Sequence, residues 1–134
     1  MDLIIFPGNN TSIKRYRSYF PKYNLYSPRE ITLGDKPNVI LCHSIGILNA
    51  LNYCIKHNII PTIICMDGVD IKIPIPKNIR ICMFRPVDKF VESDTNYEVI
   101  RYKIDDPKNR HHPYRVKKIR DQIVKEINIY NIYY

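Results

Sequence analysis

Four short apolar runs that scarcely alternate with polar residues are the strongest constraint on what this chain can fold into. A strand with one face in water alternates apolar and polar residues, whereas a nearly unbroken apolar run indicates a strand that is buried on both faces. Such strands are typical of parallel sheets that carry helices on both sides. The runs span residues 3–6, 39–42, 62–66 and 79–84.

Helical signals lie between and after these runs. Thr11 or Ser12 can cap a helix that extends to about residue 20, where Pro21 stops it, and apolar spacing predicts a second helix over 45–57. Pro113 fits the first position of a last helix that extends to about residue 127. Shorter strands are expected over 23–26 and, nearer a sheet edge, over 97–104, with loops over 28–37, 69–78 and 105–112.

The order of these elements predicts a single domain over residues 1–134. A chain of 134 residues is long enough for one hydrophobic core. Strands and helices that alternate along it indicate the α/β class. We therefore expect a three-layer α/β/α sandwich with a mainly parallel sheet.

The chain is basic, with a net charge of +8. Such a charge can attract nucleic acid or an anionic surface, but it also keeps a small protein soluble. Because the basic residues are spread along the sequence, nucleic-acid binding is only a weak hypothesis. It rests on one cluster, which comprises Arg110, Tyr114, Arg115, Lys117, Lys118 and Arg120.

The four cysteines form no CxxC pair, and three of them lie in the apolar runs. This favours buried free thiols in a reducing compartment over a zinc site, and no other pattern points to a metal or a cofactor. The first residues contain no basic leader and too few apolar residues for a signal peptide or a membrane span. We therefore expect a cytoplasmic protein without a transmembrane segment.

Ser44 stands where the apolar run 39–42 passes directly into helical spacing, in the stretch Cys42-His43-Ser44-Ile45-Gly46. A sharp strand-to-helix turn between small residues can present a nucleophilic hydroxyl above the carboxyl edge of a sheet. The N–H of Ile45 then lies at the helix N-terminus, where it can stabilise an oxyanion. The alternative is structural, with Ser44 as the N-cap of the helix.

A nucleophilic serine needs a base, and the chain contains four histidines. His43 lies inside the turn, where we expect its ring to face away from Ser44, and His57 ends the following helix. His111 and His112 lie before the last helix, at the same sheet edge as Ser44 if the sheet is parallel. Either can be the base, with a slight preference for His111, and a plain polar loop is the alternative.

The base needs an orienting acid, which should follow a strand between Ser44 and the histidine pair. Asp88 follows the run 79–84 and is the first choice, and Asp67 follows the run 62–66. Asp70 and Glu92 come after these two. An aspartate after a strand is also a common turn former.

The loop after the first strand, with Gly8 and Asn9, can supply a second backbone N–H to an oxyanion, although a plain turn would use the same residues. These motifs and their order resemble the α/β-hydrolase family of serine esterases, lipases and thioesterases. Pro7-Gly8-Asn9 together with His43-Ser44-Ile45-Gly46 is particularly similar to the lipid-droplet-associated hydrolases.

The resemblance implies a minimal serine hydrolase that cleaves a carboxylic ester or thioester, with a small-molecule acyl substrate. The sequence departs from the family in three ways: Cys42 replaces the usual glycine, the family's first two strands have no counterpart, and no insertion is long enough for a lid. A shallow, open site follows, which a homodimer or another partner would have to cover. A catalytically inactive hydrolase fold that binds protein or nucleic acid is the alternative.

Overall fold

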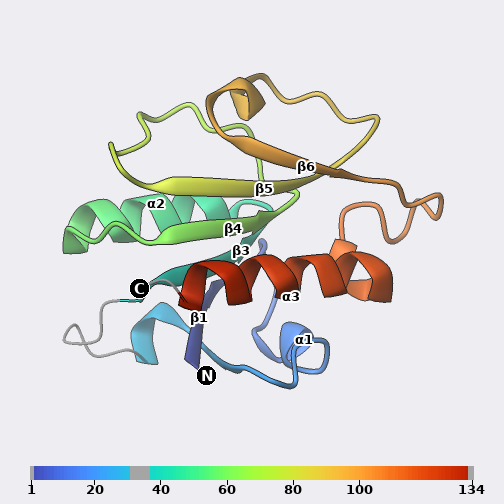
Figure 1. Ribbon diagram of the computed structural model, residues 1–134, viewed down its shortest axis with the longest axis horizontal. Coiled ribbons are helices and arrows are strands. Elements are labelled where there is room, and N and C mark those ends of the chain that lie inside the picture. Colours follow the sequence, from blue (N-terminus) through green and yellow to red (C-terminus); the bar gives the residue numbers. More distant parts are fainter. Residues whose placement is uncertain (1, 31–36, 133–134) are drawn as a thin grey trace.

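The computed structural model describes residues 2–30 and 37–132, and its centre is a six-stranded sheet (Figure 1). The strands lie in the order β2-β1-β3-β4-β5-β6, and every pair of neighbours is parallel. The expected parallel sheet is therefore confirmed for the described residues. The bounds are Asp2–Phe6 (β1), Asn24–Tyr26 (β2), Val39–His43 (β3), Thr62–Met66 (β4), Arg80–Pro86 (β5) and Glu98–Tyr102 (β6).

The burial of each strand follows the sequence pattern that predicted it. All five residues of β3 and all five of β4 are buried, as expected from runs without alternation. By contrast, β6 is mostly half-buried or exposed, which confirms its expected place at an edge. In register, Cys42 of β3 lies between Phe6 of β1 and Cys65 of β4.

Two helices cover opposite faces of the sheet. Successive strand residues point to opposite sides, so the sheet has two apolar faces, and each is covered by one helix. Helix α2, Gly46–His57, packs Ile47 and Leu51 against the face that carries Ile4 and Ile40. Helix α3, Lys117–Ile132, packs against the face that carries Leu3 and Leu41; in Figure 1 it lies nearer the viewer. The core residues that α3 contributes to this side are Ile119, Ile123 and Ile127.

The predicted helix over residues 11–20 is wrong in extent. Only Lys14–Arg17 forms a helix (α1), which covers a single turn. Tyr16, Phe20 and Tyr23 are all buried in the core beneath α3, although their spacing of i, i+4 and i+7 would also fit one face of a longer helix. The burial of these rings therefore does not by itself require the helix to end at Arg17.

The last helix also differs from its prediction. Pro113–Arg115 forms a separate 3₁₀ turn (η3), and Val116 is extended with φ −101° and ψ 116° before α3 begins at Lys117. The break allows Tyr114 to be fully buried. Two further 3₁₀ turns occur, Pro28–Glu30 (η1) and Glu92–Asn96 (η2), and the remainder of the loop expected over 28–37 falls on 31–36, outside the described residues.

A parallel sheet brings the carboxyl ends of its strands to one edge, at the right in Figure 1. The segments that carry the predicted site residues follow β1, β3, β4, β5 and β6, so all of them lie along this edge. The four cysteines lie elsewhere, in the interior, and are free thiols, as expected. No helix in the described part of the chain is long and apolar enough to cross a bilayer.

Gly46 allows α2 to begin directly against the end of β1, which makes it a sensitive position. A Cβ atom at this position would overlap the carbonyl oxygen of Phe6 and lie 2.9 Å from that of Pro7. We expect Gly46→Ala to lower the free energy of unfolding by about 2–4 kcal/mol, since backbone atoms have to move. Urea unfolding measures this. Asn49→Ala, at an exposed position of the same helix, is the control and should change stability by less than about 0.5 kcal/mol.

Candidate active site

Ser44 occupies a left-handed backbone conformation, with φ 57°, directly after β3. This conformation is uncommon for a residue other than glycine and is typical of strained functional turns. Its N–H donates to the carbonyl of Met66 at 3.1 Å, and its own carbonyl accepts from the N–H of Val69 at 3.3 Å. These bonds fix the turn to the end of β4.

The structural interpretation of Ser44 as an N-cap is wrong. The capping position of α2 is Ile45, which has helical dihedral angles (φ −65°, ψ −14°) and makes no side-chain capping bond. Ser44 is half-buried, so its side chain is not enclosed in the core. Cys42, where the resemblance leads one to expect glycine, fits within β3 as a fully buried residue.

Asp67 follows β4 as Ser44 follows β3, and it is also left-handed, with φ 46°. Its N–H donates to the carbonyl of Phe84 at 2.7 Å, and its side chain is only 2% exposed. One carboxylate oxygen, Oδ1, accepts from Arg85 Nη1 at 2.9 Å and from Lys89 Nζ at 3.0 Å. The other, Oδ2, lies 2.5 Å from His111 Nδ1.

The charge on Asp67 is stabilised although the group is buried. Burial alone would raise the pKa of this carboxyl, but the hydrogen bonds and positive charges of His111 and Lys89 outweigh it and lower the pKa to about 2. Asp67 is therefore a carboxylate at neutral pH, and it can only accept hydrogen bonds. It follows that Nδ1 of His111 carries the proton in this pair, which leaves Nε2 without one in the neutral ring.

Arg85 anchors this aspartate from inside the protein. Its side chain is fully buried and forms a two-pronged pair with Asp94, with Nε–Oδ2 at 3.0 Å and Nη2–Oδ1 at 2.9 Å. Its Nη1 binds both Asp67 and the carbonyl of Gly68. Burial would lower the pKa of the guanidinium, but the two carboxylates raise it above its ordinary value. The sequence prediction missed Arg85, because an arginine at the end of a strand usually indicates a solvated side chain.

The other predicted acids lie apart from the histidines. Asp88, the first choice from the sequence, is 58% exposed and pairs with Arg110. Asp70 accepts from the N–H of Ser93, and Glu92 begins the 3₁₀ turn η2. The structure therefore brings Asp67, and not Asp88, to the imidazole of His111.

His112 is close to His111 but differs in its contacts. Its Nδ1 lies 2.9 Å from the hydroxyl of Tyr114, and burial together with the positive charge of Arg115 lowers its pKa to about 4. No carboxylate within the described ranges, 2–30 and 37–132, forms a hydrogen bond or ion pair with its ring. Of the two candidate bases, His111 is the one that has an acidic partner.

The loop after β1 lies beside the serine. A Cβ atom on Gly8 would lie 3.5 Å from Cβ of Ser44. The N–H of Gly8, however, donates to the Tyr16 hydroxyl at 3.1 Å. Of the predicted oxyanion donors, the N–H of Gly8 is thus engaged inside the protein, which leaves the N–H groups of Ile45 and Asn9 as the better candidates.

Both ring nitrogens of His43 bind residues other than Ser44, and the side chain joins two loops. It is 2% exposed, its Nδ1 lies 2.8 Å from the Tyr16 hydroxyl, and its Nε2 lies 2.6 Å from the carbonyl oxygen of His111. Burial lowers its pKa to about 4. Sequence reasoning assigned no role to His43 or Tyr16, and only the burial expected for the residue before the turn could have drawn attention to His43.

The hydrogen bond between Ser44 and its candidate base is not formed in this structure. In the part of the chain that the structure describes, the Ser44 hydroxyl makes no hydrogen bond to His111 or His112. The ring of His111 lies 4.9 Å, centroid to centroid, from that of His43, the neighbour of Ser44. Hydroxyl–imidazole bonds of catalytic pairs are often long without substrate and shorten when it binds.

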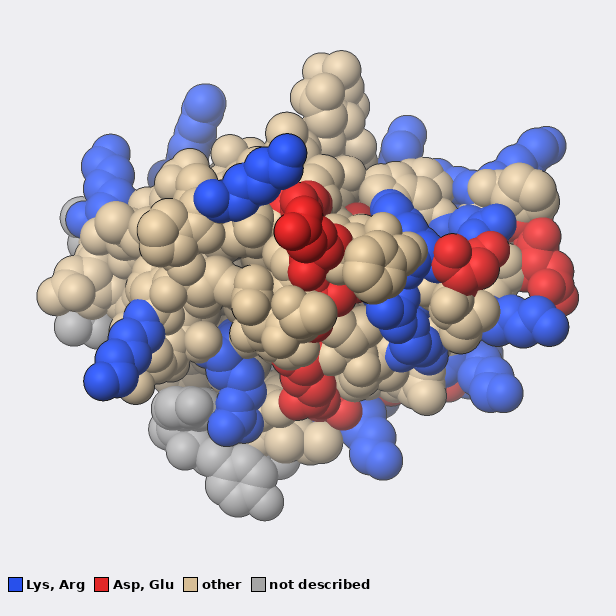
Figure 2. Space-filling model, turned by 90° about the horizontal axis from the view of Figure 1, so that it is seen from above, with Lys and Arg blue, Asp and Glu red and all other residues tan. Residues whose placement is uncertain are grey.

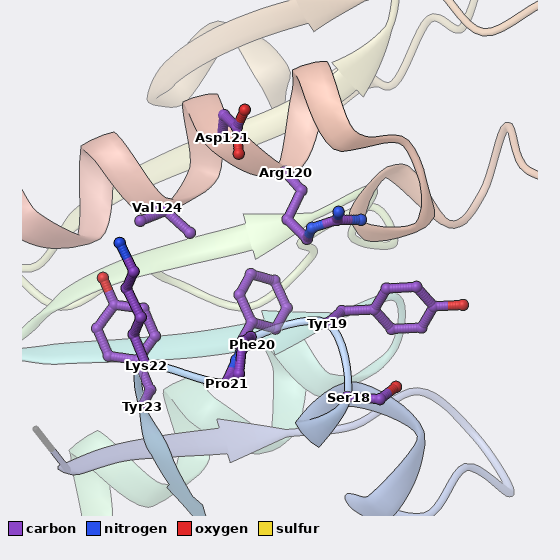
Figure 3. A pocket seen from close by; sticks show the side chains of 9 residues that line it. All are labelled: Ser18, Tyr19, Phe20, Pro21, Lys22, Tyr23, Arg120, Asp121 and Val124. Carbon is purple, nitrogen blue, oxygen red and sulfur yellow. The ribbon is translucent and has the colours of Figure 1, made fainter.

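Some cavities of the structure lie away from the candidate site. One, of about 260 Å³, lies between α3 and the segment that joins α1 to β2, and Figure 3 shows its aromatic and basic lining. Tyr19, Phe20 and Tyr23 line one side and Arg120 and Val124 the other, and Ser44, His111 and Asp67 are not among its lining residues.

One group of side chains has the spacing of metal ligands. Cys82, Glu98 and Glu126 bring their ligand atoms within 4.8 Å of one another. Burial raises the pKa of Cys82 to about 12 and also raises that of Glu126, so the protonated forms are favoured. A metal requires the deprotonated forms, and the environment therefore disfavours binding.

The basic cluster named from the sequence is largely engaged within the chain. Arg110 pairs with Asp88, Lys117 with Asp121 at 2.8 Å, and Tyr114 is fully buried and cannot stack on a base. Figure 2 shows Lys and Arg side chains dispersed over the face above β6 and mixed with Asp and Glu. On this face, therefore, the basic side chains do not form an uninterrupted patch.

Comparison with protein-family models, with curated proteins and with solved structures found no match.

Substitution of the two aspartates should distinguish their structural roles. Asp67→Asn leaves the buried Arg85 with one carboxylate fewer, and we expect the free energy of unfolding to fall by about 3 kcal/mol. Asp88→Asn breaks only an exposed pair and should cost less than about 1 kcal/mol. Urea unfolding at pH 7 measures both. Equal losses would show that the buried carboxylate does not have the role described here.

His43 should make stability depend on pH in a defined window. In the unfolded chain a histidine titrates near 6.5, whereas in the fold the pKa of His43 is about 4. Between these values the unfolded chain binds a proton that the folded chain does not, so stability falls as the pH decreases from 6.5 to 4. The loss due to His43 should be on the order of 3 kcal/mol, and His112 adds to it with the same sign.

Urea unfolding of His43→Gln between pH 7 and pH 4 tests this expectation. The variant lacks the titrating ring and should lose distinctly less stability over that window than the wild type. Asn49→Gln, at an exposed position of α2 and without a titratable group, is the control and should retain the wild-type slope. A wild-type slope in His43→Gln would contradict the assignment.

Proposed function

We propose that this protein is a small serine hydrolase that cleaves a carboxylic ester or thioester. The proposed fold is a truncated α/β-hydrolase-like form of the three-layer α/β/α sandwich. One observation carries the proposal: His111 is bound through Nδ1 to the buried carboxylate of Asp67, at the sheet edge where Ser44 has a left-handed turn. An oriented imidazole and a serine on a sharp strand-to-helix turn are the two halves of such an active site.

In the proposed reaction, Ser44 Oγ attacks the carbonyl carbon of the substrate while Nε2 of His111 accepts the hydroxyl proton. Asp67 keeps Nδ1 protonated and stabilises the imidazolium that forms. The N–H groups of Ile45 and Asn9 bind the oxyanion of the tetrahedral intermediate, and each such donor is worth roughly 3 kcal/mol.

The intermediate then collapses, the C–O or C–S bond breaks, and His111 gives its proton to the departing alcohol or thiol. Water attacks the acyl group on Ser44 with the same imidazole as base. The carboxylic acid leaves and the free hydroxyl is restored. No cofactor takes part in this scheme, and we propose a cytoplasmic location for it.

The substrate is proposed to be a small acyl compound bound in a shallow, open site. Half-burial of Ser44 and 43% exposure of the His111 side chain support access from solvent. A second copy of the chain or another partner would have to cover the site if the substrate is a large lipid.

A binding protein without catalytic activity is the second candidate. The observation that favours it is the missing hydrogen bond between Ser44 and either histidine in the described residues. In that case the strained turn and the Asp67–His111 pair would serve only to shape the edge of the sheet.

A fluorophosphonate probe, which reacts with activated serines, distinguishes the two. We expect the wild type to be labelled on Ser44 and Ser44→Ala not to be labelled. His111→Gln should slow labelling by about three orders of magnitude, because the base is lost. His112→Gln is the matched control and should be labelled at close to the wild-type rate.

Mass spectrometry of the labelled peptide identifies the site, and circular dichroism confirms that each variant is folded. Labelling of Ser44→Ala at the wild-type rate, or an unlabelled wild type, would refute the hydrolase and favour the binding protein. Equal slowing in both histidine variants would refute the assignment of His111 as the base.

A further inference from the structure

His111 is held at two points, and only one of them belongs to the proposed triad. Asp67 binds its ring, whereas His43 binds its backbone carbonyl at 2.6 Å. The residue before it, Arg110, offers its carbonyl to the Tyr102 hydroxyl at 2.6 Å. The segment that joins β6 to η3, residues 103–112, is here called the base loop; two consecutive carbonyls thus tie it to the sheet edge.

The direction of each hydrogen bond around His43 follows from the chemistry of the partners. A carbonyl oxygen only accepts, so Nε2 of His43 carries the proton that it donates to His111. In a neutral ring Nδ1 must then accept, and the Tyr16 hydroxyl donates to it at 2.8 Å. Burial supports the neutral ring, since it lowers the pKa of His43 to about 4 and raises that of Tyr16 to about 12.

The same chain of bonds continues to the other side of the serine. The Tyr16 oxygen that donates to His43 also accepts from the N–H of Gly8 at 3.1 Å. Gly8 lies in the first loop, residues 7–13, which also carries the proposed oxyanion donor Asn9. A continuous path therefore runs from Gly8 through Tyr16 and His43 to His111, and two of its three bonds are made by His43, the residue that precedes Ser44.

We infer that His43 is a positioning residue, which fixes the base loop and, through Tyr16, the first loop relative to Ser44. The inference rests on the proposed function for its catalytic consequence. In this role the side chain of His43 acts through the backbone of His111 and does not itself bind the substrate or Ser44 Oγ. Misplacement of a catalytic group by about 1 Å can cost on the order of a hundredfold in rate.

Three variants of buried residues test the inference. His43→Leu keeps an apolar volume and loses both hydrogen bonds. His43→Gln retains an amide N–H for His111 and an amide oxygen for Tyr16. Tyr16→Phe keeps the packed ring and loses only the hydroxyl, and it provides a second test if His43→Leu does not fold. His57→Leu removes an imidazole from the far end of α2 and is the control.

Two measurements are made on each full-length variant at pH 7. Hydrogen exchange is followed in peptides that cover the base loop, where the N–H groups of Asn109 and His112 are hydrogen-bonded. We expect exchange there to be faster by about tenfold or more in His43→Leu and Tyr16→Phe, with α2 and β4 unchanged. His43→Gln and His57→Leu should exchange like the wild type.

Fluorophosphonate labelling of Ser44 is the second measurement. It should slow by about ten- to a hundredfold in His43→Leu and recover most of that loss in His43→Gln. A wild type that is labelled and a His43→Leu variant that is labelled equally fast overturn the inference and leave the proposed function intact. An unlabelled wild type refutes the proposed function, and the exchange rates then decide alone: unchanged exchange of the base loop in both His43→Leu and Tyr16→Phe overturns the inference.

Discussion

The buried ion pair between Arg85 and Asp67 is the interaction on which the carboxyl edge of this sheet depends. A guanidinium without solvent is tolerated only if its donors are satisfied, and here two carboxylates and the carbonyl of Gly68 satisfy it. Asp67 belongs to the end of β4, Arg85 to β5 and Asp94 to η2. One buried charge thus holds together three elements, and the aspartate retains an oxygen for His111.

Two separate networks meet at His111. The charged network reaches its ring through Asp67, and the neutral one reaches its backbone through His43 and Tyr16. The two networks differ in the pH at which they change. Protonation of His43 removes only the acceptor at Nδ1 that the Tyr16 hydroxyl uses, whereas the charged network persists until the pH approaches the pKa of Asp67, about 2. As the pH is lowered, the bond between His43 and Tyr16 is therefore expected to change before the bond between Asp67 and the ring, while Nε2 of His43 still donates to the His111 carbonyl.

The sheet could be predicted from the sequence because its strands depend on burial alone. The runs at β3, β4 and β5 lack alternation, and a strand buried on both faces leaves that pattern whatever its neighbours are. The helix α1 could not be predicted in the same way. It packs through Tyr16 into a core shared with α3, which is more than ninety residues away in sequence and leaves no trace in local propensity.

The candidate site was predicted in part for a similar reason. Chain order alone suggested both Asp88 and Asp67 as partners of the histidine pair, and it favoured Asp88. The two differ in their cations: Arg110 binds Asp88 at the surface, whereas the buried Arg85 and the partly exposed Lys89 position Asp67. Which arginine is buried depends on packing between strands, and no short sequence motif predicts that burial.

Close contact at Gly46 has a consequence for anyone who wishes to re-engineer this molecule. Because the start of α2 touches the carbonyl oxygens of Phe6 and Pro7, the turn at Ser44 and the segment after β1 share one backbone surface. Neither can be exchanged, lengthened or grafted from another protein by itself without a steric collision. Transplants at this edge should treat residues 6–9 and 42–46 as one cassette.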